Sequence, residues 1–269
     1  MKKIIYNIVF IFILCTLIFV LTGCKKKKKK KNNVNTTTTA SSSNTNTSSN
    51  STNKVEEENK VKDVNYAEAA EKQMSMPAEN ETIAIIKVKN FGDIKVKFFK
   101  DIAPKAVENF ITHAKNGYYD GLTFHRVINE FMIQGGDPLG NGTGGESIWG
   151  NGFGVELDEE LVPYRGSLCM AMSSLPNSIG SQFFITQANY SEVMENYLKK
   201  YGYPEGLLEQ YKKYGGYLSL YMQYTVFGQV YEGMDVVDKI ASVKTETTSD
   251  GQADKPVEDV IIETIEVKE

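Results

Sequence analysis

The sequence predicts an all-β domain, either a sandwich or a closed barrel, that carries two helices. Three observations lead to this prediction. Short apolar runs alternate with glycine-rich segments over most of the chain, a hairpin signal joins the first two β-rich runs, and only two helices are expected among these runs. Periodicity alone does not distinguish a sandwich from a barrel.

The first elements follow from local patterns. The β-rich runs Thr82–Val88 and Asp93–Phe99 are joined by Asn90-Phe91-Gly92, which is typical of a hairpin turn. Pro104 then predicts the start of a helix, because proline is tolerated in the first turn, and Gly117 predicts its C-terminal cap. Four apolar residues recur at helical spacing between them: Val107, Phe110, Ile111 and Ala114.

The remaining elements are mostly short. A second short helix is expected at Met234–Ile240. Six apolar runs bounded by turn residues are the expected strands of the rest of the domain: Leu122–Ile128, Phe131–Gln134, Ser167–Met172, Gln182–Thr186, Thr225–Val230 and Val260–Val267. Cys169 lies in one of these runs, and we interpret it as a small buried apolar residue.

The first 23 residues resemble an export signal, with two lysines, an apolar run Ile4–Leu21 and a site of small residues. Leu21-Thr22-Gly23-Cys24 resembles the lipobox of bacterial lipoproteins, in which the cysteine is diacylated and the preceding segment is removed. We therefore expect a bacterial protein anchored by lipid on Cys24 and exposed outside the cytoplasmic membrane. The alternative is a transmembrane helix, for which Lys25–Lys31 would hold the following chain in the cytoplasm.

Composition separates a tether from a folded domain. Residues 32–53 are nearly all Asn, Ser and Thr, so 24–81 is interpreted as a disordered tether, mildly helical over 54–76, and 82–269 as the domain. Nine of the 30 basic residues precede residue 32 and all 34 acidic residues follow it, so residues 32–269 carry a net charge of about −13. This balance argues against a nucleic-acid partner, whereas the lysine run favours anionic lipid headgroups.

Three sequence blocks resemble the cyclophilins. The first is Phe124-His125-Arg126-Val127-Ile128 followed by Phe131-Met132-Ile133-Gln134-Gly135-Gly136-Asp137; the second is Gly166–Met172 with Asn177 and Gly180–Thr186; the third is Thr225–Val230 continuing into Glu232–Met234. The resemblance covers about 82–267. It implies a closed eight-stranded antiparallel barrel capped by two helices, and peptidyl-prolyl cis/trans isomerase activity on proline-containing unfolded or extended polypeptides.

Isomerisation of a prolyl bond requires stabilisation of a twisted amide, because rotation breaks its resonance against a barrier of ~18–20 kcal/mol. It needs no nucleophile, metal or other cofactor. The resemblance gives Arg126 the role of hydrogen-bonding the prolyl nitrogen, which suits a permanently charged planar donor. His125 is interpreted as a structural hydrogen-bonding residue. The residues matched to substrate binding are Phe131, Met132, Gln134, Ala171, Met172, Gln182, Phe184, Leu220 and Tyr224. A non-catalytic peptide-binding or chaperone module on the same scaffold is the alternative function.

Two departures from the family pattern stand out. Ser219 and Tyr224 take positions where many members have a tryptophan that packs on cyclosporin and a histidine, so we expect weak cyclosporin binding. The second departure is a tyrosine-rich insertion at about Ser191–Met222. It is interpreted either as a pair of helices packed on the barrel or as an aromatic wall that extends the substrate groove.

Overall fold

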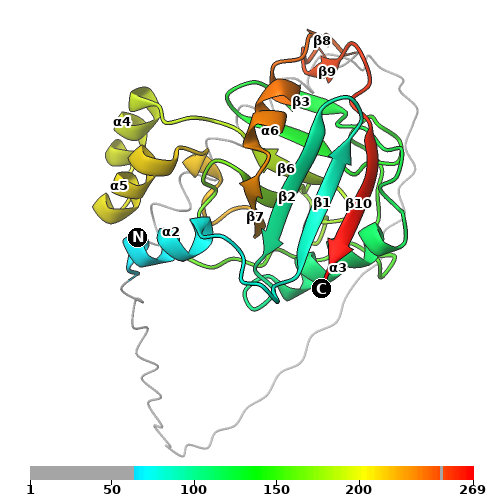
Figure 1. The fold of residues 1–269 in the computed structure, drawn as a ribbon. Coiled ribbons are helices and arrows are strands. Elements are labelled where there is room, and N and C mark those ends of the chain that lie inside the picture. The colour runs from blue at the N-terminus through cyan, green and yellow to red at the C-terminus, as the bar shows by residue number, and fades with distance from the viewer. Residues whose placement is uncertain (1–63, 249–250) are drawn as a thin grey trace, which may run out of the picture. The chain divides into compact units, whose positions relative to one another are not determined.

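The computed structural model describes residues 64–248 and 251–269, which form one compact unit (Figure 1). Its main sheet has eight antiparallel strands in the order β10-β1-β2-β7-β5-β6-β4-β3. The strands are β1 (Ile83–Val88), β2 (Gly92–Phe98), β3 (Arg126–Ile128), β4 (Met132–Gly135), β5 (Ser167–Met170), β6 (Phe183–Thr186), β7 (Val226–Glu232) and β10 (Ile262–Lys268). A separate two-stranded ladder joins β8 (Thr245–Glu246) to β9 (Lys255–Pro256).

The sheet is curled but open, so the expectation of a closed barrel is not confirmed. β10 and β3 lie at its two edges. The segment before β3 reaches β10 through a single isolated bridge, Thr123 with Ile261, and a few backbone hydrogen bonds such as Phe124 N to Val260 O at 2.9 Å. The predicted strand Leu122–Ile128 shortens to its last three residues, because the chain before Arg126 is irregular and cannot complete a ladder.

Both predicted helices are present and cover the curled sheet. They are α3 (Pro104–Lys115) and α6 (Met234–Ala241). The apolar face of α3, including Phe110, is buried in the same core cluster as the inward-facing residues of the strands. In the hairpin between β1 and β2, Asn90 and Gly92 both have positive φ, which explains the choice of these two residue types at the turn.

Three further helices build a second, smaller core. They are α2 (Tyr66–Met74), α4 (Glu192–Lys200) and α5 (Glu205–Tyr214), and a 3-10 turn η1 (Leu218–Leu220) follows them. The buried residues of this core come from these elements and from the segment before β5: Ala70, Val162, Tyr164, Leu198, Leu207, Leu208, Tyr211 and Leu218. The insertion is therefore a pair of helices packed on the domain, as one of the two interpretations predicted.

The folded domain begins earlier than the sequence predicted, because it includes the helix α2. The sequence placed residues up to 81 in the tether, but α2 is packed against the insertion and its Gln73 is 1% exposed. The mild helical pattern around Tyr66 was visible in the sequence, yet nothing in it showed that the helix has a buried face. The other predictions for the tether, together with the export signal, Cys24 and the lysine run, lie outside the described residues.

A buried carboxylate joins the two helices of the insertion. Glu195 of α4 accepts a hydrogen bond from the hydroxyl of Tyr190 and forms ion pairs with Lys199 and with Lys212 of α5. These donors, Lys199 foremost, lower the pKa of Glu195 to about 2. The carboxylate is therefore charged at every physiological pH, which keeps α4 and α5 in one arrangement.

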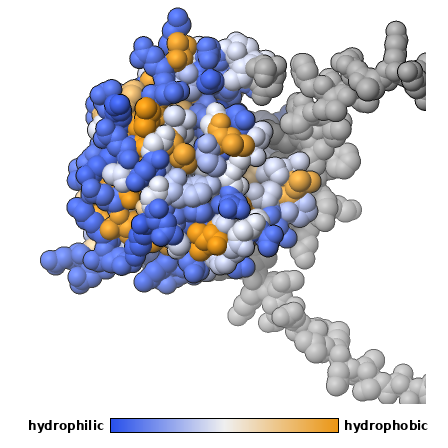
Figure 2. All heavy atoms as spheres, turned by 90° about the vertical axis from the view of Figure 1, so that its right-hand side faces the viewer, coloured by the Kyte–Doolittle hydropathy of each residue, from blue (hydrophilic) through white to orange (hydrophobic). Residues whose placement is uncertain are grey.

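Among the described residues that are visible on the face to the right in Figure 1, no broad apolar area is seen. Figure 2 shows this face as mainly hydrophilic, with apolar side chains in small separate groups. Scattered exposed apolar residues of this kind are ordinary for the surface of a folded domain. Among the described residues, no helix has the length and apolar character needed to cross a bilayer.

Candidate active site

Strand alternation explains how the expected pocket residues come together. Val127 of β3 and Ile133 of β4 point into the main core. Their sequence neighbours therefore point to the opposite face of the sheet. The strand register pairs Arg126 with Gln134, and Gln134 with Phe184 of β6. Directly paired residues share a face, so these three side chains form one row outside the core.

A cavity of about 110 Å³ lies over this row. It is lined by Arg126, Phe131, Met132, Gln134, Ala171, Met172, Phe184, Leu220 and Tyr224. Every residue expected to bind substrate, apart from Gln182, thus lies at one site with Arg126. Gln182 lines an adjoining cavity of about 370 Å³, which shares Gln134, Ala171 and Met172 with the first. The smaller cavity has the volume of roughly three or four liquid waters, which suits a single small ring.

The floor of the cavity is apolar and closely packed. Met132 and Phe184 are 1% and 5% exposed, and the ring of Tyr224 meets that of Phe184 edge-on with centroids 5.6 Å apart. Burial raises the pKa of Tyr224, so its phenol is protonated at neutral pH. Cys169 lies beneath, fully buried and unpaired, and burial raises the pKa of its thiol. The interpretation of Cys169 as a small buried apolar residue is confirmed.

The opposite wall is polar and forms a chain of hydrogen bonds. Arg126 Nη1 donates to Gln134 Oε1 at 3.4 Å, and Gln134 Nε2 donates to Gln182 Oε1 at 2.9 Å. Gln182 Nε2 in turn donates to the carbonyl oxygen of Gly144 at 2.7 Å. At the other end, Arg126 Nε donates to Asp254 Oδ2 at 2.7 Å. The chain fixes the orientation of both glutamine amides and of the guanidinium.

The loop that supplies Gly144 is organised by Asp137. Its carboxylate accepts backbone N–H groups from Leu139, Asn141 and Gly142 at 2.6 to 3.1 Å. Burial of Asp137 opposes ionisation, but the backbone donors outweigh it and lower the pKa of the carboxyl. The loop is therefore held by a charged group at neutral pH, and this places Gly144 beside Gln182.

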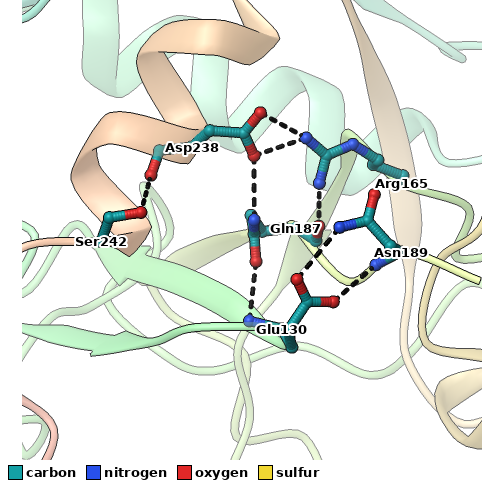
Figure 3. A network of polar contacts seen from close by, with 6 residues as sticks. All are labelled: Glu130, Arg165, Gln187, Asn189, Asp238 and Ser242. Atoms are coloured by element: carbon teal, nitrogen blue, oxygen red, sulfur yellow. Dashed lines mark hydrogen bonds and ion pairs between the residues drawn. The ribbon is translucent and has the colours of Figure 1, made fainter. Parts of the chain in front are cut away.

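The turn that carries Phe131 into the cavity is held from outside the site (Figure 3). Glu130 has φ +57°, a conformation that a non-glycine residue adopts only when its surroundings hold it. Gln187 provides two contacts: its Oε1 accepts Glu130 N, and its backbone N donates to Phe131 O, both at 2.8 Å. The carboxylate of Glu130 accepts the backbone N and Nδ2 of Asn189 at 3.1 and 3.0 Å.

The same network continues to α6. Gln187 Nε2 donates to Asp238 at 2.9 Å, and Arg165 is paired with Asp238 and hydrogen-bonded to the carbonyl oxygen of Gln187. Figure 3 shows Asp238 and Arg165 on the side of Gln187 away from Glu130. None of these residues carried a recognisable signal in the sequence, because their partners lie far apart along the chain.

The insertion also contacts the site. The ring of Tyr217, just after α5, lies 4.3 Å from that of Phe131 between centroids. Gly216 N donates to Ala188 O at 2.9 Å, so the chain just after α5 lies against the chain just before the insertion. Tyr217 does not line the cavity itself. Tyr217 instead packs against Phe131, which does line the cavity. Neither interpretation of the insertion included this contact.

The structure differs from the sequence interpretation at His125. Its side chain is buried, but neither ring nitrogen has a hydrogen-bond partner among the described residues. Burial lowers the pKa of His125, so the ring is neutral at pH 7. It therefore contributes by packing rather than as the expected hydrogen-bonding residue.

A family model described as "Cyclophilin type peptidyl-prolyl cis-trans isomerase/CLD" matches residues 83–267, which contain the whole cavity. The chain belongs to the cyclophilin-type peptidyl-prolyl cis-trans isomerases. The family predicted from the three sequence blocks is thereby confirmed. The match begins after α2, so this cyclophilin carries a packed helix beyond the part that the family model describes.

Relatives and solved structures agree with this assignment. Two relatives are named "Putative peptidyl-prolyl cis-trans isomerase", one from Staphylococcus epidermidis and one from Staphylococcus aureus. They are 48% and 46% identical to this chain over 200 residues, which is 73% of this chain and 98% of each relative. A cyclophilin crystal structure from Cryptosporidium parvum has a TM-score of 0.56 at 32% identity, covering 70% of this chain and 98% of that chain. A second structure of that protein, in the presence of the dipeptide Ala-Pro, has a TM-score of 0.55 at 33% identity and covers 70% of this chain and 99% of that one.

Proposed function

We propose that this cyclophilin isomerises X–Pro bonds of exported proteins at the outer face of the cytoplasmic membrane of a bacterium. Arg126 stabilises the twisted prolyl amide while the proline ring occupies the apolar cavity. The observation that carries the proposal is the position of Arg126, a permanent cation, on the rim of a cavity whose floor is formed by Met132 and Phe184.

The geometry suits this chemistry. A guanidinium has five N–H donors, and Arg126 uses two of them, at Nε with Asp254 and at Nη1 with Gln134. The other three have no partner among the described residues and are available to a substrate. As the prolyl amide twists, its nitrogen lone pair localises and becomes an acceptor, so a fixed cationic donor stabilises the transition state more than the planar ground state.

The substrates in this proposal are proline-containing polypeptides in unfolded or extended form. The solved relative crystallised in the presence of Ala-Pro supports this choice, because its sequence and fold are similar to those of this chain. The larger cavity next to the proline site is lined by glycines and small polar residues, including Gly144, Ser173 and Ser178. It offers room for a neighbouring residue of an extended chain.

A protease-coupled isomerisation assay tests the activity. The full chain, purified in mild detergent, is added to a chromogenic X–Pro peptide that the protease cleaves only in the trans form. We expect the slow phase, which takes tens of seconds without catalyst, to shorten in proportion to enzyme concentration. A slow phase that is unchanged at micromolar enzyme would contradict the proposal and favour a non-catalytic peptide-binding module.

The proposed location rests on Cys24 and predicts a specific loss of anchoring. Cys24→Ser removes the thiol that would carry lipid, so we expect the protein to appear in the soluble fraction or to remain unprocessed. Membrane fractionation with a size comparison by electrophoresis checks this, and Cys15→Ser, which changes the other cysteine of the segment, is the matched control. A Cys24→Ser protein that stays in the membrane at its normal mature size would point instead to a transmembrane helix.

A further inference from the structure

The contact between Arg126 and Asp254 is the closest polar contact made by the guanidinium. Arg126 Nε lies 2.7 Å from Asp254 Oδ2, compared with 3.4 Å between Nη1 and Gln134 Oε1. The two side chains differ in exposure, at 37% for Arg126 and 9% for Asp254. A buried carboxylate thus holds the inner end of the guanidinium, while the outer end remains open to the cavity and to solvent.

Asp254 is positioned by a part of the fold that lies outside the main sheet. It directly precedes β9, which pairs with β8 in the separate two-stranded ladder. Its backbone oxygen accepts Val127 N at 2.7 Å. The main chain and the side chain of Asp254 therefore bind two consecutive residues of β3, one through the backbone and one through the guanidinium. Asp254 is held against β3 even without its ion pair, so its carboxylate is ready to receive Arg126.

Orientation matters for the reaction proposed above. A free arginine side chain samples many rotamers, and it must lose that freedom before it can donate in one direction. Binding at Nε fixes the guanidinium plane. It leaves Nη2 and the second N–H of Nη1 without a partner among the described residues, at the edge that faces the cavity. The carboxylate also offsets part of the positive charge of Arg126, so its benefit to catalysis must come from orientation rather than from an increase in charge.

We propose that Asp254 is a positioning residue for Arg126, and that the β8–β9 hairpin serves to deliver it. This inference depends on the role proposed for Arg126. Asp254 itself touches no substrate, and it acts only through the side chain that it holds. Asp254 lies outside all three sequence blocks that identified the family, so no motif indicated it.

A double-mutant cycle tests the inference. Asp254→Ala should lower kcat/KM roughly tenfold, mainly through kcat, because a misdirected donor weakens transition-state binding more than ground-state binding. Asp254→Asn should restore most of the rate, since an amide oxygen still accepts the Nε–H. In the Arg126→Ala background, Asp254→Ala should change the rate by less than about twofold, because nothing is left to position. Asp259→Ala, an exposed carboxylate on the same segment, is the matched control.

A spectroscopic measurement makes the result independent of stability. In the proton–nitrogen NMR spectrum, the Arg126 Nε–H signal should be visible and protected from exchange in the unmodified protein and in Asp254→Asn, but lost in Asp254→Ala. Equal rate losses in both backgrounds, or full activity of Asp254→Ala, would overturn the positioning role. If Arg126→Ala itself remains fully active, the mechanism proposed for Arg126 fails. If Arg126→Ala is inactive while Asp254→Ala is fully active, only the positioning role of Asp254 fails.

Discussion

Arg126→Ala should lower kcat/KM by roughly 10²–10³. Loss of a single charged donor to a transition state typically costs ~3–4 kcal/mol, which corresponds to this factor. The remaining residues of the cavity offer apolar contacts and neutral amides, so none of them replaces a cation next to the prolyl nitrogen. The peptide should still bind, and the loss should therefore appear mainly in kcat.

The protease-coupled assay measures this loss, but the structure requires a particular control. In Arg126→Ala, the nearly buried carboxylate of Asp254 loses its cationic partner. The unpaired charge destabilises the fold, and this alone lowers the measured rate without any change in the chemical step. Arg126→Ala combined with Asp254→Asn removes that charge. Arg126→Lys keeps a cation but lacks the planar fork that binds two partners. If Arg126→Ala or the combined variant has near-normal activity and an unchanged circular dichroism spectrum, the mechanism is wrong.

Gln73→Ala should destabilise the folded domain by about 3 kcal/mol, or roughly a hundredfold in the folding equilibrium. Gln73 lies before the residues that the family model matches. Gln73 Nε2 donates to Val162 O at 2.7 Å, and Gln73 Oε1 accepts Val162 N at 3.1 Å. The same amide nitrogen lies 3.1 Å from Ser167 Oγ and from Gln229 Oε1. Alanine would leave Val162 N–H buried without a partner and a cavity beside it.

Urea denaturation followed by circular dichroism measures this effect. The matched control is Glu71→Ala on the same helix, whose exposed side chain should contribute less than about 0.5 kcal/mol. A chain that begins at residue 82 should show at least the loss seen for Gln73→Ala, because it lacks α2 altogether. Equal midpoints for Gln73→Ala and Glu71→Ala would contradict the predicted contribution of Gln73.

The sequence predicted the cavity well because most of its residues belong to short motifs that lie on or next to adjacent strands. Once Val127 and Ile133 face the core, alternation leaves only one face for Arg126 and Gln134. The catalytic and binding roles of these residues stay predictions, whereas their assembly around one cavity is observed. The two expected helices were also predictable, because each has an apolar face, and Pro104 marks the start of the first.

What the sequence did not predict depends on contacts between distant segments. Asp254, Gln187 and Gln73 are single polar residues without a periodic pattern, and only the fold shows what they bind. Closure of the barrel was expected from the family, but it depends on whether the irregular chain around Thr123 forms a continuous ladder with β10. Local residue types do not determine that.

The packing of α2 also decides how the domain responds to mechanical load. Tension applied through the chain before residue 64 reaches α2 before it reaches any strand. α2 is held by side-chain packing, by Gln73, and by the amine of Lys97, which donates to Lys72 O at 2.9 Å. The next element, β1, is hydrogen-bonded to β2 on one side and to β10 on the other. Under tension, α2 should detach from the rest of the domain first. The chain before β1 then becomes longer, and the strands that carry Arg126 and Phe184 remain unloaded.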